Sequence, residues 1–396
     1  LIVSPAIDMQ HPLVVRAKEL GVEVIGEIEY AYRESNGLLL AVTGTNGKTT
    51  TVTLLGEIFK NAGRTTFVVG NIGNPYSGAV PEMRAGDVTV CEVSSFMLET
   101  IVKFHPAISA VLNISEDHMN RHHTMENYIA LKERIFENSG EGDFVILNYD
   151  DPITRDMANR AKCKVVWFSS REVVPYGAFV KDGEIVFGTE NAHATVCRAD
   201  EVYIPGEHNL RNALAATAMA TVAGIPAPVI RHTLRTFQGV EHRIEFVREL
   251  DGVRWYNDSI ATSPSRAMIG TLSLYDFKIV MIAGGADKKV PFDELGKVIC
   301  DKVKTLVLLA PEKPLEGFKT PAAGKIEAAV RGAENYKDGA PVILHANNMK
   351  DAVRLARESA EPGDVVSLCP AATGFDMYKS FAVRGDIYRE EVKALK

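Results

Sequence analysis

The residues with the clearest chemistry are Thr-Gly-Thr-Asn-Gly-Lys-Thr-Thr at positions 43–50, between an apolar run and a helical pattern. Two glycines in this stretch allow a tight turn in which consecutive backbone N–H groups can face phosphate oxygens. The following helix adds a partial positive charge at its N-terminus, Lys48 adds a full one, and Thr49 offers a hydroxyl to Mg²⁺. The pattern predicts a nucleoside triphosphate site formed by Gly44, Asn46, Gly47, Lys48, Thr49 and Thr50.

This loop is a variant of the usual P-loop. The usual pattern has a glycine five positions before the Gly-Lys pair, where this chain has Val42. The alternative is a plain glycine-containing loop between a strand and a helix. The order strand, loop, Lys-Thr and helix argues for the phosphate site.

Two further polar segments follow apolar runs, at the carboxyl ends of predicted strands, where open α/β folds bind ligands. Glu92 could hold Mg²⁺ beside the phosphates, and Ser94 with its serine neighbour could bind substrate. Taken alone, a glutamate at a strand end is more often a capping or solvated residue. His118 follows the next run and is a candidate second metal ligand, whereas we expect His122 and His123 to be solvated loop residues.

Two residues carry no functional signal of their own. Lys132 lies in a predicted amphipathic helix over residues 128–136, and periodicity predicts that it is on the surface. Asn71, between Gly70 and Gly73, has the pattern of an ordinary turn residue.

Composition excludes several classes of protein. With 396 residues, 46% hydrophobic and 24% charged, the chain is globular and too long for one ordinary core. A net charge of −7 without a Lys/Arg-rich run argues against nucleic-acid or membrane-surface binding, and no apolar stretch is long enough to span a bilayer. The five scattered cysteines include no CxxC pair, which argues against disulfides or a zinc knuckle and predicts a cytoplasmic protein.

Short β-branched runs alternate with longer helical patterns, which is typical of βαβ units and mostly parallel sheets. Strands of a first sheet are predicted at 38–42, 88–93, 107–114, 144–148 and 165–168. A hairpin with a type I′ turn at Asp182-Gly183 is predicted over 178–188. Strands of a second, small open sheet are predicted at 253–258, 277–285, 305–310, 341–345 and 364–370. We expect an α/β protein with domains at 1–36, 37–239 and 240–396.

The order of nine segments in this chain resembles that of the Mur ligases. These segments are TGTNGKTT, GNIG, CEVSSFMLE, NISEDHMNRH, YIALKERIFEN, GEHNLRNALAA, GVEHRIEFV, NDSIATSP and IAGGADK. The resemblance covers essentially the whole chain and is strongest to the branch that adds D-glutamate to UDP-N-acetylmuramoyl-L-alanine in peptidoglycan synthesis. It implies a P-loop central domain, a Rossmann-like C-terminal domain that binds the amino acid, and an N-terminal UDP-binding domain of which residues 1–36 would be the remainder, its first part lacking.

The resemblance also implies residue roles on the ATP side. Lys48 and Thr49 would hold ATP phosphates and a Mg²⁺ ion that Glu92 also binds. His118 would bind a second Mg²⁺ together with Lys132, which would carry a CO₂-derived carbamate and so offer anionic oxygens to a hard cation. The nucleotide would also contact Asn209 at the adenine, Arg243 at a phosphate and Asp258 at the ribose.

On the substrate side, the resemblance assigns Asn71 to the nucleotide phosphates or the acyl phosphate. Thr262, Lys288 and Phe381 would help to bind D-glutamate, with His242 near the domain joint. Two positions depart from the family pattern, because Ile260 stands where a lysine is common and Gly374 where a serine is expected. Both departures fall in the acceptor pocket.

The implied activity is an ATP-dependent amide ligation through an acyl phosphate, with small-molecule substrates and a monomeric protein. Three alternatives stay open: another amino-acid ligase of the same family, a P-loop NTPase that switches a partner, and an ATP-binding remnant without turnover. Phosphate release that depends on both the UDP-sugar and the amino acid would separate them.

Overall fold

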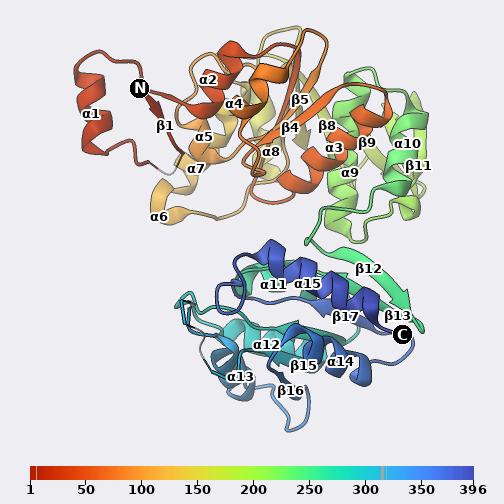
Figure 1. Ribbon diagram of the computed structural model, residues 1–396. Helices are drawn as coiled ribbons and strands as arrows, with labels where there is room; N and C mark the ends of the chain where they lie inside the picture. The colour runs from red at the N-terminus through yellow and green to blue at the C-terminus, as the bar shows by residue number, and fades with distance from the viewer. Residues whose placement is uncertain (6, 314–315, 318) are drawn as a thin grey trace. The chain divides into compact units, whose positions relative to one another are not determined.

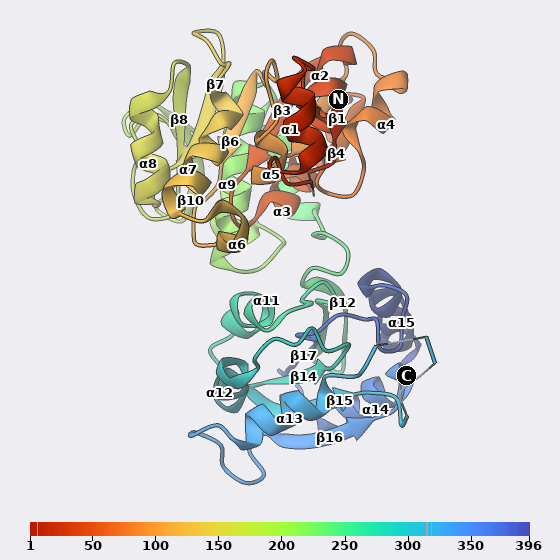
Figure 2. The same ribbon diagram turned by 90° about the vertical axis from the view of Figure 1, so that its left-hand side faces the viewer.

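The computed structural model describes residues 1–5, 7–313, 316–317 and 319–396. The chain divides into two compact units, Leu1–Phe237 and Gln238–Lys396 (Figures 1 and 2). The domain limits at 36 and 239 remain predictions. Within the described part of the chain, no helix has the length and apolar character that a membrane crossing requires.

Unit 1 contains a small parallel pair and a nine-stranded sheet. The pair consists of β1 (Ile2–Val3) and β2 (Ile25–Gly26). The large sheet has the order β11-β10-β9-β8-β7-β6-β3-β5-β4 and is parallel from β4 to β9, with β10 and β11 antiparallel. Its strands are β3 (Leu38–Thr43), β4 (Thr66–Gly70), β5 (Val88–Glu92), β6 (Ile108–Val111), β7 (Phe144–Asn148), β8 (Lys164–Ser169), β9 (Gly177–Lys181), β10 (Glu184–Gly188) and β11 (His193–Arg198).

The helices of unit 1 connect these strands. They are α1 (Pro12–Glu19), α2 (Glu27–Glu34), α3 (Lys48–Asn61), α4 (Tyr76–Ala79), α5 (Ser95–Leu98), α6 (Met119–His122), α7 (Met125–Glu133), α8 (Pro152–Met157), α9 (Glu207–Val222) and α10 (Ala227–Thr236). Four 3₁₀ turns complete the unit, at Val80–Glu82, Arg134–Phe136, Ala158–Arg160 and Ala199–Glu201.

The central strands of unit 1 are buried on both faces, as expected for a parallel sheet covered by helices. In β3, all residues after Leu38 are buried. Helices α3, α9 and α10 pack against one another (Figure 1). The predicted hairpin is confirmed: Asp182 and Gly183 both have positive φ, at 50° and 78°, between β9 and β10.

Unit 2 contains a six-stranded sheet in the order β12-β13-β17-β14-β15-β16, with only β12 antiparallel to its neighbour. Its strands are β12 (Glu245–Leu250), β13 (Val253–Asn257), β14 (Ile279–Ala283), β15 (Val303–Leu309), β16 (Val342–Ala346) and β17 (Val365–Leu368). Its helices are α11 (Pro264–Ile269), α12 (Asp293–Lys302), α13 (Ala323–Arg331), α14 (Met349–Ser359) and α15 (Phe381–Ala394), with a 3₁₀ turn at Thr271–Ser273.

Strand alternation gives unit 2 two cores, one on each face of its sheet. Along β14, Met281 packs in the core with α12 and α13, whereas Val280 and Ile282 pack in the other core with α14 and α15. Figure 2 shows the helices on either side of this sheet. The second predicted sheet is therefore confirmed, and the residues that follow its strands lie together at one edge.

Glu29 on α2 is a buried carboxylate that joins α2 to the loop before β6. Its side chain has no exposed surface and accepts hydrogen bonds from the backbone N–H groups of Val102, Lys103 and Phe104 at 2.8–2.9 Å and from Arg33 at 2.7 Å. Burial by itself would raise the pKa of Glu29, but these hydrogen bonds favour the charged form and together lower the pKa below the ordinary value of 4.5.

We expect Glu29→Gln to lower the free energy of unfolding at pH 7 by about 2 kcal/mol, because buried donors lose a charged acceptor. Folding lowers the pKa of Glu29, so its contribution is complete above pH 4.5 and is lost as the pH falls through the lower pKa of the folded state. Urea unfolding at several pH values measures both effects. Glu23→Gln is the control, since Glu23 is 55% exposed and also binds Arg33; equal losses in both variants would contradict the argument.

Candidate functional site

The candidate site of unit 1 lies where four neighbouring parallel strands end. The order β6-β3-β5-β4 brings together the residues that follow these strands. Asn113 follows β6, the 44–47 loop follows β3, Glu92 ends β5 and Asn71 follows β4. This is the edge where parallel α/β sheets bind ligands.

The 44–47 loop has the geometry of a phosphate cradle. Gly44 and Gly47 have φ values of 143° and 84°, which favour glycine. A Cβ on Gly47 would also lie 2.3 Å from Asn212 Oδ1, so the loop packs closely on α9. Helix α3 begins at Lys48, and no side chain caps its N-terminus. The first backbone N–H groups of the helix are therefore available to an anion.

Asn113 and Thr45 hold this loop in place. The Asn46 N–H donates to Asn113 Oδ1 at 2.8 Å, and Asn113 Nδ2 donates to the Asn46 carbonyl at 3.0 Å. Thr45 Oγ1 lies 3.1 Å from Tyr128 Oη and accepts from the Ser115 N–H at 3.0 Å. The sequence reasoning missed Asn113, although its place at a strand end was a usable signal.

Two lysines meet on one carbonyl oxygen of the loop. Lys48 Nζ donates to the Gly44 oxygen at 2.9 Å and to the Thr45 oxygen at 2.8 Å. Lys132 Nζ donates to the same Gly44 oxygen at 2.8 Å and lies 3.4 Å from Thr43 Oγ1. Burial, followed by the charge of Lys48, lowers the pKa of Lys132 well below the ordinary lysine value.

The prediction that Lys132 is a surface residue was wrong, because only 2% of it is exposed. Lys132 lies one helical turn after Tyr128 on the buried face of α7, and its ammonium sits 4.8 Å from the centre of the Tyr128 ring. The spacing from Tyr128 was a signal for burial, but the charge of lysine outweighed it in the sequence reasoning.

Glu92 and Asn71 form a hydrogen-bonded pair that uses one of the two carboxylate oxygens of Glu92. Asn71 Nδ2 donates to Glu92 Oε1 at 2.8 Å, so the two distant predicted residues are in contact. Glu92 Oε2 is buried and accepts no hydrogen bond. A buried carboxylate oxygen without a donor fits a hard cation such as Mg²⁺ at this position.

The histidines differ from expectation. His118 is half exposed and faces Asp117, with Nε2 3.5 Å from Asp117 Oδ2, and has a φ of 56°. His122 was expected to be solvated, and that prediction was wrong. Its ring is 3% exposed, stacks on Phe96 and contacts Ser95 Oγ through Nε2 at 3.0 Å. Among the described residues, no group of three or more His, Cys, Asp or Glu could hold a metal by itself.

Two other predicted residues of unit 1 have local structural partners. Ser94 caps α5 by accepting the Met97 N–H at 3.3 Å. Asn209 Nδ2 donates to the Pro205 oxygen at 2.7 Å and Asn209 Oδ1 accepts from Asn212 at 3.2 Å. Because Asn212 also lies against Gly47, Asn209 is two contacts away from the phosphate cradle.

In unit 2, the predicted residues follow β13 and β14. Asp258 follows β13 and is 3% exposed; its oxygens accept hydrogen bonds from Thr271 Oγ1 at 2.8 Å and from the Ile244 N–H at 3.3 Å. Burial raises the pKa of Asp258 to about 7. Both oxygens therefore face protein donors, and Thr271 was not recognised from the sequence.

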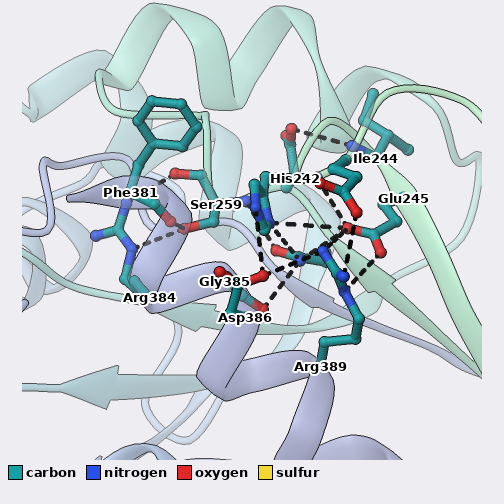
Figure 3. Close-up of polar contacts among 12 residues, drawn as sticks. His242, Ile244, Glu245, Ser259, Phe381, Arg384, Gly385, Asp386 and Arg389 are labelled. Carbon is teal, nitrogen blue, oxygen red and sulfur yellow. Dashed lines mark hydrogen bonds and ion pairs between the residues drawn. The ribbon is translucent and has the colours of Figure 1, made fainter.

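His242 is buried against α15, in a polar network with residues of that helix (Figure 3). Its Nδ1 lies 3.1 Å from Asn257 Nδ2 and its backbone N–H donates to Glu245 Oε2 at 2.8 Å. Its Nε2 lies 3.7 Å from Asp386 Oδ1. A Cβ on Gly385 would lie 2.2 Å from Nδ1, so the close approach of the ring requires a glycine in α15.

The predicted acceptor residues are more accessible. Lys288 is exposed after β14, Phe381 begins α15 with 36% of its surface exposed, and Thr262 is half-buried. Burial, followed by the positive charges of Arg266 and Lys319, lowers the pKa of Lys288. The positive charges of Arg266 and Lys319 therefore repel that of Lys288.

The chain is similar to known proteins over its whole length. Residues 42–220 match the family described as "Mur ligase middle domain", and residues 242–372 match "Mur ligase, glutamate ligase domain". A protein of Thermoanaerobacter pseudethanolicus named UDP-N-acetylmuramoylalanine--D-glutamate ligase is 46% identical over 396 residues, which are 100% of this chain and 84% of that protein. The protein of that name from Clostridioides difficile is 42% identical with the same coverage.

Solved structures share the fold. A UDP-N-acetylmuramoyl-L-alanyl-D-glutamate--2,6-diaminopimelate ligase aligns with a TM-score of 0.66 at 19% identity, over 99% of this chain and 91% of that one. MurF ligase from Thermotoga maritima aligns with a TM-score of 0.63 at 18% identity, over 99% and 95%. The family matches and the extent of identity confirm the predicted resemblance: this chain belongs to the Mur ligase family.

Proposed function

We propose that this protein joins D-glutamate to UDP-N-acetylmuramoyl-L-alanine in an ATP-dependent, ADP-forming reaction in the cytoplasm, for peptidoglycan synthesis. The observation that carries the proposal is the meeting of Lys48, Lys132 and the unpartnered oxygen of Glu92 around one P-loop. The names of the relatives that match the whole chain support the choice of substrates.

The reaction has two steps. An oxygen of the alanine carboxylate attacks the γ-phosphorus of ATP, the bond from that phosphorus to the β–γ bridging oxygen breaks, and ADP leaves. The neutral amine of D-glutamate then attacks the acyl carbon, loses a proton, and displaces inorganic phosphate, which carries away one carboxyl oxygen. Phosphoryl transfer depends mainly on positioning and charge stabilisation. The first turn of α3 and Lys48 supply both at the phosphates.

Mg²⁺ would be held by Glu92 and Thr49, with a second ion near His118 and Lys132. When bound, the ions neutralise charge on the phosphates. Asn71 orients Glu92, since its amide occupies Oε1 and leaves Oε2 for a cation. The His118 side chain lies 3.5 Å from Asp117, packs on the Phe96 ring and is half exposed, so its imidazole is accessible as a ligand.

Lys132 has the properties that a carbamate requires. A lysine reacts with CO₂ as its neutral amine, forming a C–N bond and releasing a proton. Burial and the charge of Lys48 both favour that neutral form by lowering the pKa of Lys132. The carbamate would place an anion beside the Lys48 ammonium, whereas a protonated Lys132 would repel that ammonium at the shared Gly44 carbonyl.

The acceptor is assigned to unit 2. D-Glutamate carries two carboxylates, and the positive charges of Lys288, Arg266 and Lys319, which act on one another, suit them. Arg266 and Lys319 would supply positive charge to the acceptor, which Ile260, at a position where a lysine is common in the family, does not. Phe381, the first residue of α15, is 36% exposed and would offer its ring to the acceptor.

We expect phosphate release to require ATP, UDP-N-acetylmuramoyl-L-alanine and D-glutamate together, and ¹⁸O in the alanine carboxyl group to appear in the released phosphate. Lys48→Ala should lower kcat by about 100-fold or more, because it removes a cation from the transferring phosphoryl group. Lys60→Ala, an exposed lysine of α3, is the control. Amino-acid-independent release would support an NTPase, release with another amino acid would identify a different ligase of the family, and ATP binding without release would indicate a remnant.

Asn113→Ala should raise the KM for ATP about tenfold, because the backbone of Asn46 loses the two hydrogen bonds that hold the phosphate loop. Steady-state kinetics and direct ATP titration measure the change. Asn159→Ala is the matched control, since the Asn159 side chain donates to the exposed Asp156. A change in kcat at an unaltered KM for ATP would contradict the positioning role.

Lys132→Ala should lower kcat by about 100-fold. Added bicarbonate should not restore it, whereas a short carboxylate such as formate should do so in part, since it can occupy the place of the carbamate. Removal of dissolved CO₂ should lower the activity of the unchanged protein. Lys132→Arg keeps a cation and should not be rescued. Full activity of the alanine variant would exclude Lys132 from the mechanism.

A further inference from the structure

Arg384 of α15 is a buried cation whose hydrogen bonds all go to neutral oxygens. Only 1% of the residue is exposed. Its Nε donates to Ser259 Oγ at 3.0 Å, and its two terminal nitrogens donate to the carbonyl oxygens of Ser259 at 2.8 Å, Ala372 at 3.1 Å and Gly284 at 3.3 Å (Figure 3 shows the Ser259 contacts). Arginine is the only side chain whose charged group carries five N–H donors in a fixed plane, so it can donate to several acceptors in different directions.

The acceptors of Arg384 lie on the three segments that follow β13, β17 and β14, which are neighbours in the sheet. Each segment carries part of the proposed acceptor site: Thr262 follows Ser259, Lys288 follows Gly284, and Gly374 follows Ala372. Ser259 Oγ also donates to the Phe381 carbonyl at 2.7 Å. One guanidinium therefore connects every segment to which the amino acid has been assigned.

Burying the charge of Arg384 costs free energy, which argues that this residue has a role beyond packing. Burial lowers the pKa of Arg384 only to about 10, so the side chain stays protonated at neutral pH. Its nearby countercharge is Asp376, whose carboxylate is buried and accepts no hydrogen bond. A buried charge held mainly by carbonyl oxygens is weak evidence for stabilisation and stronger evidence for a specific geometry.

Gly285 gives an independent indication of how tightly the segments are packed. Its φ is 145°, and a Cβ there would lie 2.2 Å from the Thr373 carbonyl oxygen and 2.9 Å from Arg384 Nη1. The Ala286 N–H also donates to the Thr373 oxygen at 2.6 Å. The close approach of the segments after β14 and β17, two of the three that Arg384 joins, thus requires a glycine at position 285.

We propose that Arg384 is a positioning residue for the acceptor amino acid: it sets the spacing of the segments after β13, β14 and β17 and thereby the affinity for that substrate. The proposal rests on the proposed function for the identity of the substrate. Lysine cannot replace arginine here, because one ammonium cannot reach all four oxygens.

The test uses the full chain with Arg384→Lys, Ser259→Ala and the control Arg331→Lys, which alters an exposed ion pair on α13. Arg384→Lys should raise the KM for D-glutamate about tenfold or more while the KM for ATP stays unchanged. Amide hydrogen exchange should become faster in 259–262, 284–288 and 372–375 and stay unchanged in β15 and β16. Arg331→Lys should change neither quantity.

Ser259→Ala keeps the three carbonyl contacts and removes only the hydroxyl, so it should fold even if Arg384→Lys does not. Exchange should then accelerate at 259–262 and around Phe381 but not at 284–288. Faster exchange throughout unit 2, or equal changes in KM for ATP and D-glutamate, would overturn the positioning role. If the unchanged protein shows no turnover with D-glutamate, the proposed function fails, while the exchange pattern still decides whether Arg384 holds the three segments.

Discussion

The Gly44 carbonyl oxygen accepts hydrogen bonds from two lysine side chains, and the site of unit 1 depends on that contact. Two ammonium groups within hydrogen-bond distance of one oxygen repel each other strongly in a buried place. Burial and the charge of Lys48 lower the pKa of Lys132, which favours its neutral form and so reduces this repulsion. Helix periodicity alone predicts a surface position for Lys132, whereas the packing of β3 and α7 buries its amine beside the Gly44 carbonyl.

The buried carboxylates Glu92 and Asp258 differ in how many of their oxygens accept hydrogen bonds from the protein. Glu92 has one oxygen held by Asn71 and one with no donor, so it is prepared for a ligand that the protein does not supply. Asp258 has donors on both oxygens and is therefore already satisfied within unit 2. The two buried carboxylates therefore differ in the number of donors that the protein supplies, and the contact of Asp258 with the ribose stays a prediction.

The half-buried cation Lys48 and the buried cation Arg384 differ in how their donors are held. Lys48 lies at the start of a helix and has a flexible chain that can exchange carbonyl oxygens for phosphate oxygens. Arg384 has rigid donors directed at segments from three strands, and its contacts are too many to be given up for a substrate. This difference underlies the roles proposed for them: Lys48 in binding phosphate and Arg384 in positioning the segments of unit 2.

The amino-acid sequence by itself determined the α/β class, the two sheets, the hairpin at Asp182-Gly183 and the phosphate loop, because these depend on local periodicity, glycine and helix-start signals. The resemblance to a family led to Lys132 and Asn71, which local patterns had assigned to a surface and a turn. Only the tertiary structure decided that Lys132 and His122 are buried, that Asn71 meets Glu92 and that Asn113 holds Asn46. Those contacts join residues far apart in the chain, and their energies depend on which strands are neighbours, a property that no local pattern contains.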